Sequence, residues 1–366
     1  MKNEKEPIRI LNVVPNMRAA GIESFIMNVY RNIDRNKIQF DFLVHNSKKE
    51  FYDDEIEKMG GIIYRLSYKD DKNIIKYIKD LDTFFKKHKE YKIIHGHMQS
   101  MMPLYLCIAK KNNIPIRIAH SHKGDYDRTL KGLILHIFSR FSKIYSTCNI
   151  ACSRVAGDYL FRKEHFDIIY NGIDIEKFKF NKKIRKEKKE KLDLNGNSPV
   201  LLHVGRFEAE KNHIFLIDMF EKYHKKQPNS VLLLAGEGKL ENRIKEKVRE
   251  KKIENSVKFL GVRNDINEIM QASDFFLLPS LYEGLPVTGI EAQYAGLKCI
   301  FSSKVTDEVK ILEKTAFIDI DCVDKWVNEL DNADFINRET PSEEKFNIKI
   351  IAKDMEKRYI EEYKKL

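Results

Sequence analysis

The sequence predicts an α/β protein of two domains, each with a parallel β-sheet covered by helices. Three observations predict this class. The chain of 366 residues is too long for one ordinary core and fits two domains of roughly 150–200 residues. Short apolar runs alternate with longer helical patterns, as is typical of βαβ units. The alternation stops at a charged segment, 179–191, and then begins again.

Strands that are apolar throughout indicate parallel sheets with both faces covered. In the first half we expect such strands at 8–14, 40–44, 62–64, 93–95, 116–120, 149–152 and 168–170. Helical patterns lie between several of them, at 23–32, 74–88, 104–112 and 130–142.

The charged segment reads as a domain boundary. Its lysines alternate with glutamates and it lacks aromatic residues for base stacking, so we expect a solvated surface helix and not a nucleic-acid site. After residue 199 we expect strands at 200–204, 231–235, 257–260, 275–278 and 299–302. We expect helices at 214–224, 241–251, 265–272 and 288–295, and a final amphipathic helix at 347–366.

Composition narrows the class of partner. The net charge of +11 favours an anionic partner: nucleic acid, an anionic membrane surface or a phosphorylated substrate. Solvated lysine faces without a partner are the alternative explanation of this charge. No helix-turn-helix, RNA-recognition or zinc signature is present, so we expect no nucleic acid. Five scattered cysteines indicate reduced thiols and a cytoplasmic protein. No apolar run approaches the roughly 20 residues of a membrane span, which leaves attachment at the membrane surface as the alternative.

The first half carries two candidate ligand contacts. A turn of small residues leads from the first strand into a helix at Gly21, and a helix N-terminus with close backbone approach can hold a phosphate. An ordinary strand-to-helix turn is the alternative. Histidines end two strands, and we expect His120 to hydrogen-bond a polar group such as a sugar hydroxyl. Without a cysteine or carboxylate at ligand spacing, we expect no metal there.

The second half carries more candidates, each directly after a strand. Arg206 and Lys211 flank one loop, and two fixed cations suit a diphosphate. Glu237 lies between glycines in a second loop, and Asp265, which we expect to be a helix N-cap, follows a third. Since all these loops end strands of one sheet, together they describe a site of nucleotide size.

The stretch LYEGLPVTGIE places Glu283 before a turn and Glu291 about one turn into a helix. A carboxylate accepts paired hydrogen bonds from vicinal diols, as on a ribose or a sugar ring. Backbone N–H groups near Gly284 and Leu285 would meet an anion at the helix start. These residues therefore predict a site for two sugars with a phosphate between them.

With these motifs, the chain resembles the retaining glycosyltransferases of family 4, also called group 1, including bacterial capsular and exopolysaccharide enzymes. The matching motifs are EGLPVTGIE, GRFEAEKN, AGEG, GVRNDI, YNGIDIEKF and AAGIE, between residue 8 and about residue 300. The motif AAGIE departs from the usual pattern by having Ala20 at the first glycine. The resemblance implies a GT-B fold, with two Rossmann-like domains whose parallel sheets face a cleft. It implies an acceptor-binding domain at 1–170, onto which a helix at about 351–366 packs back, and a domain binding the nucleotide sugar at 171–350.

The resemblance also implies roles. Arg206 and Lys211 would bind the donor diphosphate, Glu291 the ribose, and Glu283 with the following amides the transferred sugar. His120 would contact that sugar. The remaining donor-binding residues would be Gly21, Glu237, Val262, Arg263, Gly284 and Leu285. The family uses no metal or cofactor and retains the anomeric configuration. The donor would be a UDP-sugar, and the acceptor a saccharide or lipid-linked saccharide in surface polysaccharide synthesis.

Two other enzyme classes remain as alternatives. A sugar-nucleotide epimerase could use the same two-domain scaffold and would turn over donor without an acceptor. A metal-dependent transferase would use an Asp-x-Asp motif, which occurs at Asp125 to Asp127 and at Asp319 to Asp321, although such short matches arise by chance.

One stretch, 69–92, suggests how the chain could meet a membrane. Its apolar residues recur at near-helical spacing and are expected to face the core, whereas its lysines could rest on anionic lipid. The apolar residues are Ile74, Ile75, Ile78, Leu81, Phe84 and Phe85, and the lysines most suited to the lipid are Lys76, Lys79, Lys86 and Lys87.

Overall fold

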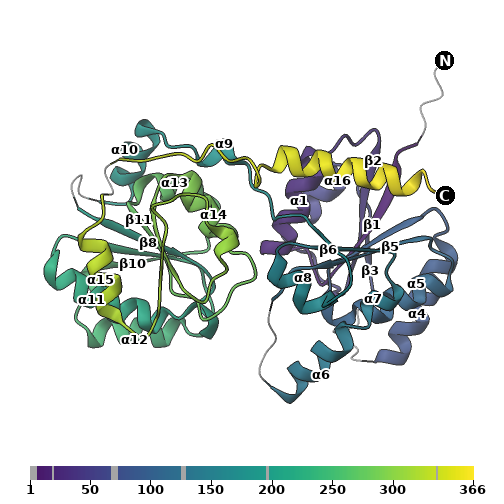
Figure 1. Cartoon of the computed structure of the whole chain (residues 1–366), viewed down its shortest axis with the longest axis horizontal. Helices are drawn as coiled ribbons and strands as arrows, with labels where there is room; N and C mark the ends of the chain where they lie inside the picture. Colours follow the sequence, from purple (N-terminus) through teal and green to yellow (C-terminus); the bar gives the residue numbers. More distant parts are fainter. Residues whose placement is uncertain (1–5, 19, 67–72, 125–128, 195–197, 335–336) are drawn as a thin grey trace. The chain divides into compact units, whose positions relative to one another are not determined.

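The computed structural model describes residues 6–18, 20–66, 73–124, 129–194, 198–334 and 337–366. The chain forms two compact units (Figure 1). Unit 1 contains Met1–Ile173 and Lys345–Leu366, and unit 2 contains Asp174–Glu344.

Unit 1 is a seven-stranded parallel sheet in the order β3-β2-β1-β4-β5-β6-β7. Its central strands are apolar on both sides, so helices must cover both faces of the sheet. The strands are β1 (Ile8–Val14), β2 (Ile38–Val44), β3 (Ile63–Arg65), β4 (Ile93–Gly96), β5 (Ile116–Ser121), β6 (Cys148–Ala151) and β7 (Asp167–Ile168). The helices are α1 (Gly21–Asn32), α2 (Asp53–Lys58), α4 (Ile74–Lys87), α5 (Met102–Lys111), α6 (Leu130–Ser139), α7 (Ser142–Tyr145), α8 (Arg154–Phe161) and α16 (Ile348–Tyr363).

The terminal helix α16 belongs to unit 1. Its residues Ile348, Ile351, Met355 and Tyr359 are buried in the same core cluster as residues of α1 and β2. In Figure 1 it runs alongside α1. The last residues of the chain thus complete the core formed by its first residues.

Unit 2 is a six-stranded parallel sheet in the order β10-β9-β8-β11-β12-β13. The strand β13, which the sequence did not predict, adds one edge. The strands are β8 (Val200–Val204), β9 (Val231–Ala235), β10 (Val257–Gly261), β11 (Phe275–Leu278), β12 (Lys298–Ser302) and β13 (Ala316–Ile318). The helices are α9 (Ile175–Phe178), α10 (Lys182–Lys191), α11 (His213–Lys226), α12 (Glu241–Glu250), α13 (Ile266–Ala272), α14 (Val287–Tyr294) and α15 (Val323–Asp331).

The charged segment forms α10, but one face of that helix is not solvated, so the prediction of a solvated helix was wrong there. Lys188 is buried and contacts the carboxylates of Asp265 and Glu268. Arg185 pairs with the buried Asp274 at 2.7 Å. Buried cations need such partners, because an unpaired charge would pay the full cost of losing water.

The helix α4 differs from its expected orientation. It buries Tyr77, Leu81, Phe84 and Phe85, whereas Ile74, Ile75 and Ile78 are exposed. The expectation that these three isoleucines face the core was therefore wrong. Lys76, Lys79, Lys86 and Lys87 are exposed, and residues 69–72 of the predicted stretch lie outside the described residues.

The structure bears on the two Asp-x-Asp motifs and on membrane-spanning helices. The motif at 125–127 lies outside the described residues, and Asp319 of the second motif accepts a hydrogen bond from the Ser303 hydroxyl. Within the described ranges, no helix combines the length and the hydrophobicity that a membrane crossing needs.

Candidate active site

Four loops of unit 2 meet at one edge of its sheet. The strands β10, β9, β8 and β11 are consecutive neighbours, so the loops that follow them emerge side by side. Main-chain hydrogen bonds join them: Gly236 N–H donates to Gly261 O at 2.8 Å, Phe207 N–H to Glu237 O at 2.9 Å, and Leu281 N–H to Glu210 O at 2.8 Å. The candidate residues are therefore carried on one connected surface.

The two glycines beside Glu237 are required by this packing. Gly236 has φ +139°, and a Cβ there would lie 2.1 Å from the carbonyl oxygen of Gly205. A Cβ at Gly238 would lie 2.6 Å from the carbonyl oxygen of Phe207. Both positions are closed to larger residues by the neighbouring loop, so these glycines hold Glu237 in place without any need to invoke a ligand.

The structure brings Lys211 and Glu283 into direct contact, although they come from different loops. The Lys211 ammonium pairs with Oε1 of Glu283, which also accepts a hydrogen bond of 2.7 Å from Ser280. Each of the two charged side chains is 15% exposed. The side chain predicted to bind the phosphate, Lys211, and the side chain predicted to bind the sugar, Glu283, thus form one partly buried, charge-assisted contact.

Arg206 lies on the same edge but is mostly exposed. Its guanidinium is 3.0 Å from Oε1 of Glu210, and 65% of its side chain is accessible. An exposed ion pair of this kind contributes little to stability. The Arg206 guanidinium can therefore turn toward an anion at little cost.

The helix α14 begins beside the Lys211–Glu283 contact, and backbone N–H groups at its start have no hydrogen-bond acceptor among the described residues. Its N-cap residue, Pro286, supplies no side-chain hydrogen bond. In the part of the chain that the structure describes, the N–H groups of Gly284 and Leu285 donate to no acceptor. Free amides at a helix start, combined with the positive end of the helix dipole, favour an anion.

Glu291 occupies the first turns of α14. Its carboxylate has no ion-pair or hydrogen-bond partner among the described residues, and burial raises the pKa of this carboxyl to about 8. The Glu291 side chain is half-buried, and a carboxyl with a raised pKa and no charged partner is more typical of a functional site than of a structural position. The group is ready to accept hydrogen bonds from a bound hydroxyl pair.

The loop after β10 is organised by an ion pair. The Val262 side chain is 62% exposed, and Arg263 makes two hydrogen bonds to Asp265, at 2.7 and 2.6 Å. Asp265 is the N-cap residue of α13, as expected, but its side chain makes no capping hydrogen bond. Instead its carboxylate contacts Arg263 and Lys188, and both contacts lower its pKa.

In unit 1, Gly21 is the first residue of α1, and a Cβ added there would meet nothing within 4 Å. The space in front of this helix start is open, and Ala20 precedes it in extended conformation. Ala19 lies outside the described residues. No contact in unit 1 requires glycine at position 21.

Four histidines form one buried network in unit 1. His97 bonds Oδ1 of Asn12 at 3.3 Å and Nε2 of His122 at 2.9 Å. His95 bonds the Tyr359 hydroxyl at 2.7 Å and Nδ1 of His120 at 3.1 Å. Burial lowers the pKa of all four imidazoles, so they are neutral at pH 7.

The side chain of His120 is fully buried in this network at the end of β5, and its expected contact with a sugar hydroxyl stays a prediction. His122 follows the end of that strand, and among the described residues neither Nε2 of His120 nor Nδ1 of His122 has a hydrogen-bond partner. Sequence reasoning missed His122 because it placed the strand end at residue 120. Nitrogens of His95, His97 and His120 lie within 4.8 Å of one another. These three imidazoles could hold a metal ion, and a hydrogen bond joins His95 to His120.

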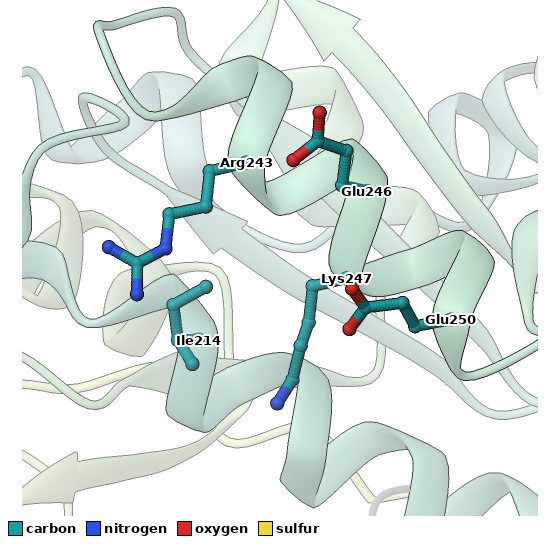
Figure 2. Close-up of a pocket in the computed structure, with 5 residues that line it drawn as sticks. All are labelled: Ile214, Arg243, Glu246, Lys247 and Glu250. Atoms are coloured by element: carbon teal, nitrogen blue, oxygen red, sulfur yellow. The ribbon is translucent and has the colours of Figure 1, made fainter.

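A separate pocket lies along α12, between that helix and the start of α11. Figure 2 shows Arg243, Glu246, Lys247 and Glu250 around Ile214. None of the predicted site residues lines it. Its side chains are of mixed charge, without the free amides and glycine-rich loops found at the sheet edge.

Comparison with known proteins decides the family. Residues 184–318 match the model of the glycosyl transferases group 1, and residues 19–177 match the model of glycosyltransferase family 4. The chain is 32% identical over 309 residues to the Bacillus subtilis protein EpsF, named as a glycosyltransferase, covering 82% of this chain and 80% of EpsF. The chain belongs to the family 4, group 1 glycosyltransferases.

Two further similarities extend this result. The glycosyltransferase is 30% identical to an Escherichia coli UDP-Gal:alpha-D-GlcNAc-diphosphoundecaprenol alpha-1,3-galactosyltransferase, over 70% of each chain. The crystal structure of HepE from Anabaena in complex with UDP-glucose matches with a TM-score of 0.76 at 16% identity, over 98% of this chain and 100% of HepE. The two Rossmann-like units of this glycosyltransferase are those of the GT-B fold, as the resemblance implied.

Proposed function

We propose that this glycosyltransferase moves a sugar from a UDP-sugar to a saccharide or lipid-linked saccharide, with retention of the anomeric configuration, in surface polysaccharide synthesis. The observation that carries the proposal is the Lys211–Glu283 contact beside the free amides of Gly284 and Leu285. The nucleotide sugar in the HepE complex and the lipid-linked acceptor in the name of the E. coli relative support this choice of donor and acceptor.

The proposed roles follow from the chemistry of each group. Arg206 and Lys211 would hold the diphosphate, Glu291 would accept hydrogen bonds from the ribose diol, and Glu283 with the amides would hold the sugar. The base would lie beside Val262 and Arg263. Unit 2 would bind the donor, and unit 1 would bind the acceptor and contribute Gly21 and a histidine of the network.

The reaction breaks the bond between the anomeric carbon and the diphosphate oxygen, and negative charge develops on that diphosphate. The cations of Arg206 and Lys211, together with the free amides, would stabilise this charge once Arg206 has turned toward the bound diphosphate. The leaving diphosphate would take the proton of the acceptor hydroxyl on the same face of the sugar. No nucleophile or metal of the protein is then required.

The alternatives are not favoured by the family match. An epimerase would turn over the donor without an acceptor. A metal-dependent transferase would need its Asp-x-Asp carboxylates beside the donor, whereas in the described chain Asp319 is bonded to Ser303. We propose that the enzyme works in the cytoplasm, where nucleotide sugars are made, and meets its acceptor at the inner face of the cytoplasmic membrane.

The proposal is tested by screening sugar nucleotides for thermal stabilisation of the full chain and for slow hydrolysis, with and without EDTA. We expect one class of donor to stabilise the protein, and we expect chelation to leave turnover almost unchanged. Turnover that EDTA abolishes and manganese restores would favour the Asp-x-Asp alternative. Rapid interconversion of donor without an acceptor would favour an epimerase.

A further inference from the structure

The helix α6 exposes its apolar side chains and buries its small and polar ones. Its buried side consists of small or polar residues, His136 and Ser139, with the half-buried Gly132 on the same stripe. The His136 ring lies 4.1 Å from the ring of Tyr159 in α8. Its apolar residues face outward, the opposite of a helix that packs its apolar stripe on a protein core.

The exposed apolar surface continues into α7. Eight large apolar residues between 130 and 144 are exposed, among them Leu130 at 76%, Ile134 at 58%, Ile144 at 55% and Ile137 at 50%. Single exposed apolar side chains are ordinary, but a cluster on two consecutive helices indicates a surface that binds something. Figure 1 shows α6 at the periphery of unit 1, beyond α7.

Charge identifies the kind of partner. From residue 129 to residue 157 the sequence contains no aspartate or glutamate, but it contains Lys131, Arg140, Lys143 and Arg154. Lys143 pairs with Glu164 at 3.1 Å, and Lys131 is exposed. An apolar face with a rim in which basic residues outnumber carboxylates is typical of helices that lie in the interface of an anionic bilayer.

A second copy of the chain fits this surface less well. In a twofold dimer the same patch meets itself, so the basic residues of one copy would face those of the other. Anionic lipid headgroups would neutralise these residues instead, while the acyl region accepts the isoleucines and leucines.

We propose that α6 and α7 dock this glycosyltransferase on an anionic lipid bilayer, with the apolar side chains of 130–144 inserted below the headgroups. The acceptor class rests on the proposed function: docking here would bring unit 1 to the surface that holds a lipid-linked saccharide. The docking face is α6 and α7, not the lysine-rich side of α4 that the sequence suggested.

The test compares the wild type with two double variants of the full chain. Ile134→Gln with Ile137→Gln removes apolar surface from α6. The matched control, Ile74→Gln with Ile75→Gln, removes it from α4, where these isoleucines are 40% and 64% exposed. All four substituted side chains are exposed in the wild type, so folding should be preserved.

Co-sedimentation is measured with vesicles of phosphatidylglycerol and phosphatidylcholine at low salt. The wild type should bind the vesicles. The affinity of the α6 variant should be lower by at least about tenfold, and the affinity of the α4 variant should equal that of the wild type. Raising the salt concentration, or removing phosphatidylglycerol, should weaken wild-type binding because the basic rim is screened or unmatched.

Several outcomes would overturn the proposal. They are a wild type that ignores anionic vesicles, an α6 variant that binds as well as the wild type, and loss of binding in the α4 variant alone. A wild-type dimer that the α6 variant dissociates would assign the face to a second copy. Thermal stabilisation by a UDP-sugar, measured on all three proteins, separates this result from the donor chemistry. If no UDP-sugar stabilises even the wild type, the proposed function fails while the docking result still stands.

Discussion

Replacing Lys211 with alanine should lower kcat/KM for sugar transfer by at least about tenfold while the protein remains folded. Lys211 would lose a charge-assisted contact to the donor diphosphate, worth roughly 1.5–3 kcal/mol, and more if charge grows in the transition state. The substitution also leaves the carboxylate of Glu283 with only the Ser280 hydroxyl as a partner. Sugar positioning should therefore suffer together with phosphate binding.

Arg206→Ala should also lower transfer about tenfold but should disturb the unliganded protein less, because Arg206 is exposed and its ion pair among the described residues is with Glu210. Lys239→Ala is the matched control: this lysine lies in the next loop, is 87% exposed, and is 3.7 Å from Glu208. It should keep nearly full activity. Near-normal kcat/KM for both Arg206→Ala and Lys211→Ala would refute the diphosphate assignment.

Replacing Glu291 with glutamine should change how unfolding free energy depends on pH. The carboxyl has a pKa of about 8 when folded and about 4.5 when unfolded. Between these values the unfolded chain releases a proton that the folded chain keeps, so this group destabilises the native state as pH rises. Glutamine does not ionise. The unfolding free energy of the variant should therefore increase relative to that of the wild type between pH 5 and pH 8, by up to about 4 kcal/mol.

Urea unfolding followed by the fluorescence of Trp326 measures this difference, because the chain has one tryptophan and it is buried in unit 2. Glu246→Gln on α12 is the control, and its unfolding free energy should depend on pH in the same way as that of the wild type. If the unfolding free energies of the wild type and Glu291→Gln also have the same pH dependence, the pKa of the Glu291 carboxyl is not raised in the folded protein. A ribose diol donates to the ionised carboxylate, so UDP affinity should also rise between pH 7 and 8.5, in the wild type only.

Much of the sheet architecture could be predicted because its signals are local. Strands such as β8 and β11 are runs of four or five apolar residues that end at a loop motif, and each motif places its charged residues at the carboxyl edge. The order of strands in the sheet is not local. Lys211 and Glu283 are 72 positions apart, and their contact depends on β8 and β11 being neighbours.

The failures have the same origin. Strand β5 ends at Ser121, one residue beyond the predicted end, so the sequence did not single out His122, and the apolar run alone does not set that end. The apolar composition of 130–139 is that of a core helix, and only its packing through His136 and Ser139 shows that the apolar side is exposed. Asp265 is at the predicted N-cap position, but its carboxylate pairs with Arg263 of the preceding loop and Lys188 of α10 instead of capping the helix.

The central claim is that the sheet edge of unit 2 binds the nucleoside diphosphate of the donor. Hydrogen exchange of the full chain with and without UDP tests it most directly. We predict slower exchange at 205–212, 236–240 and 279–291, with the largest change at the free amides of Gly284 and Leu285, and no change along α12. Protection confined to the α12 pocket or to unit 1, or no protection at saturating UDP, would contradict this account.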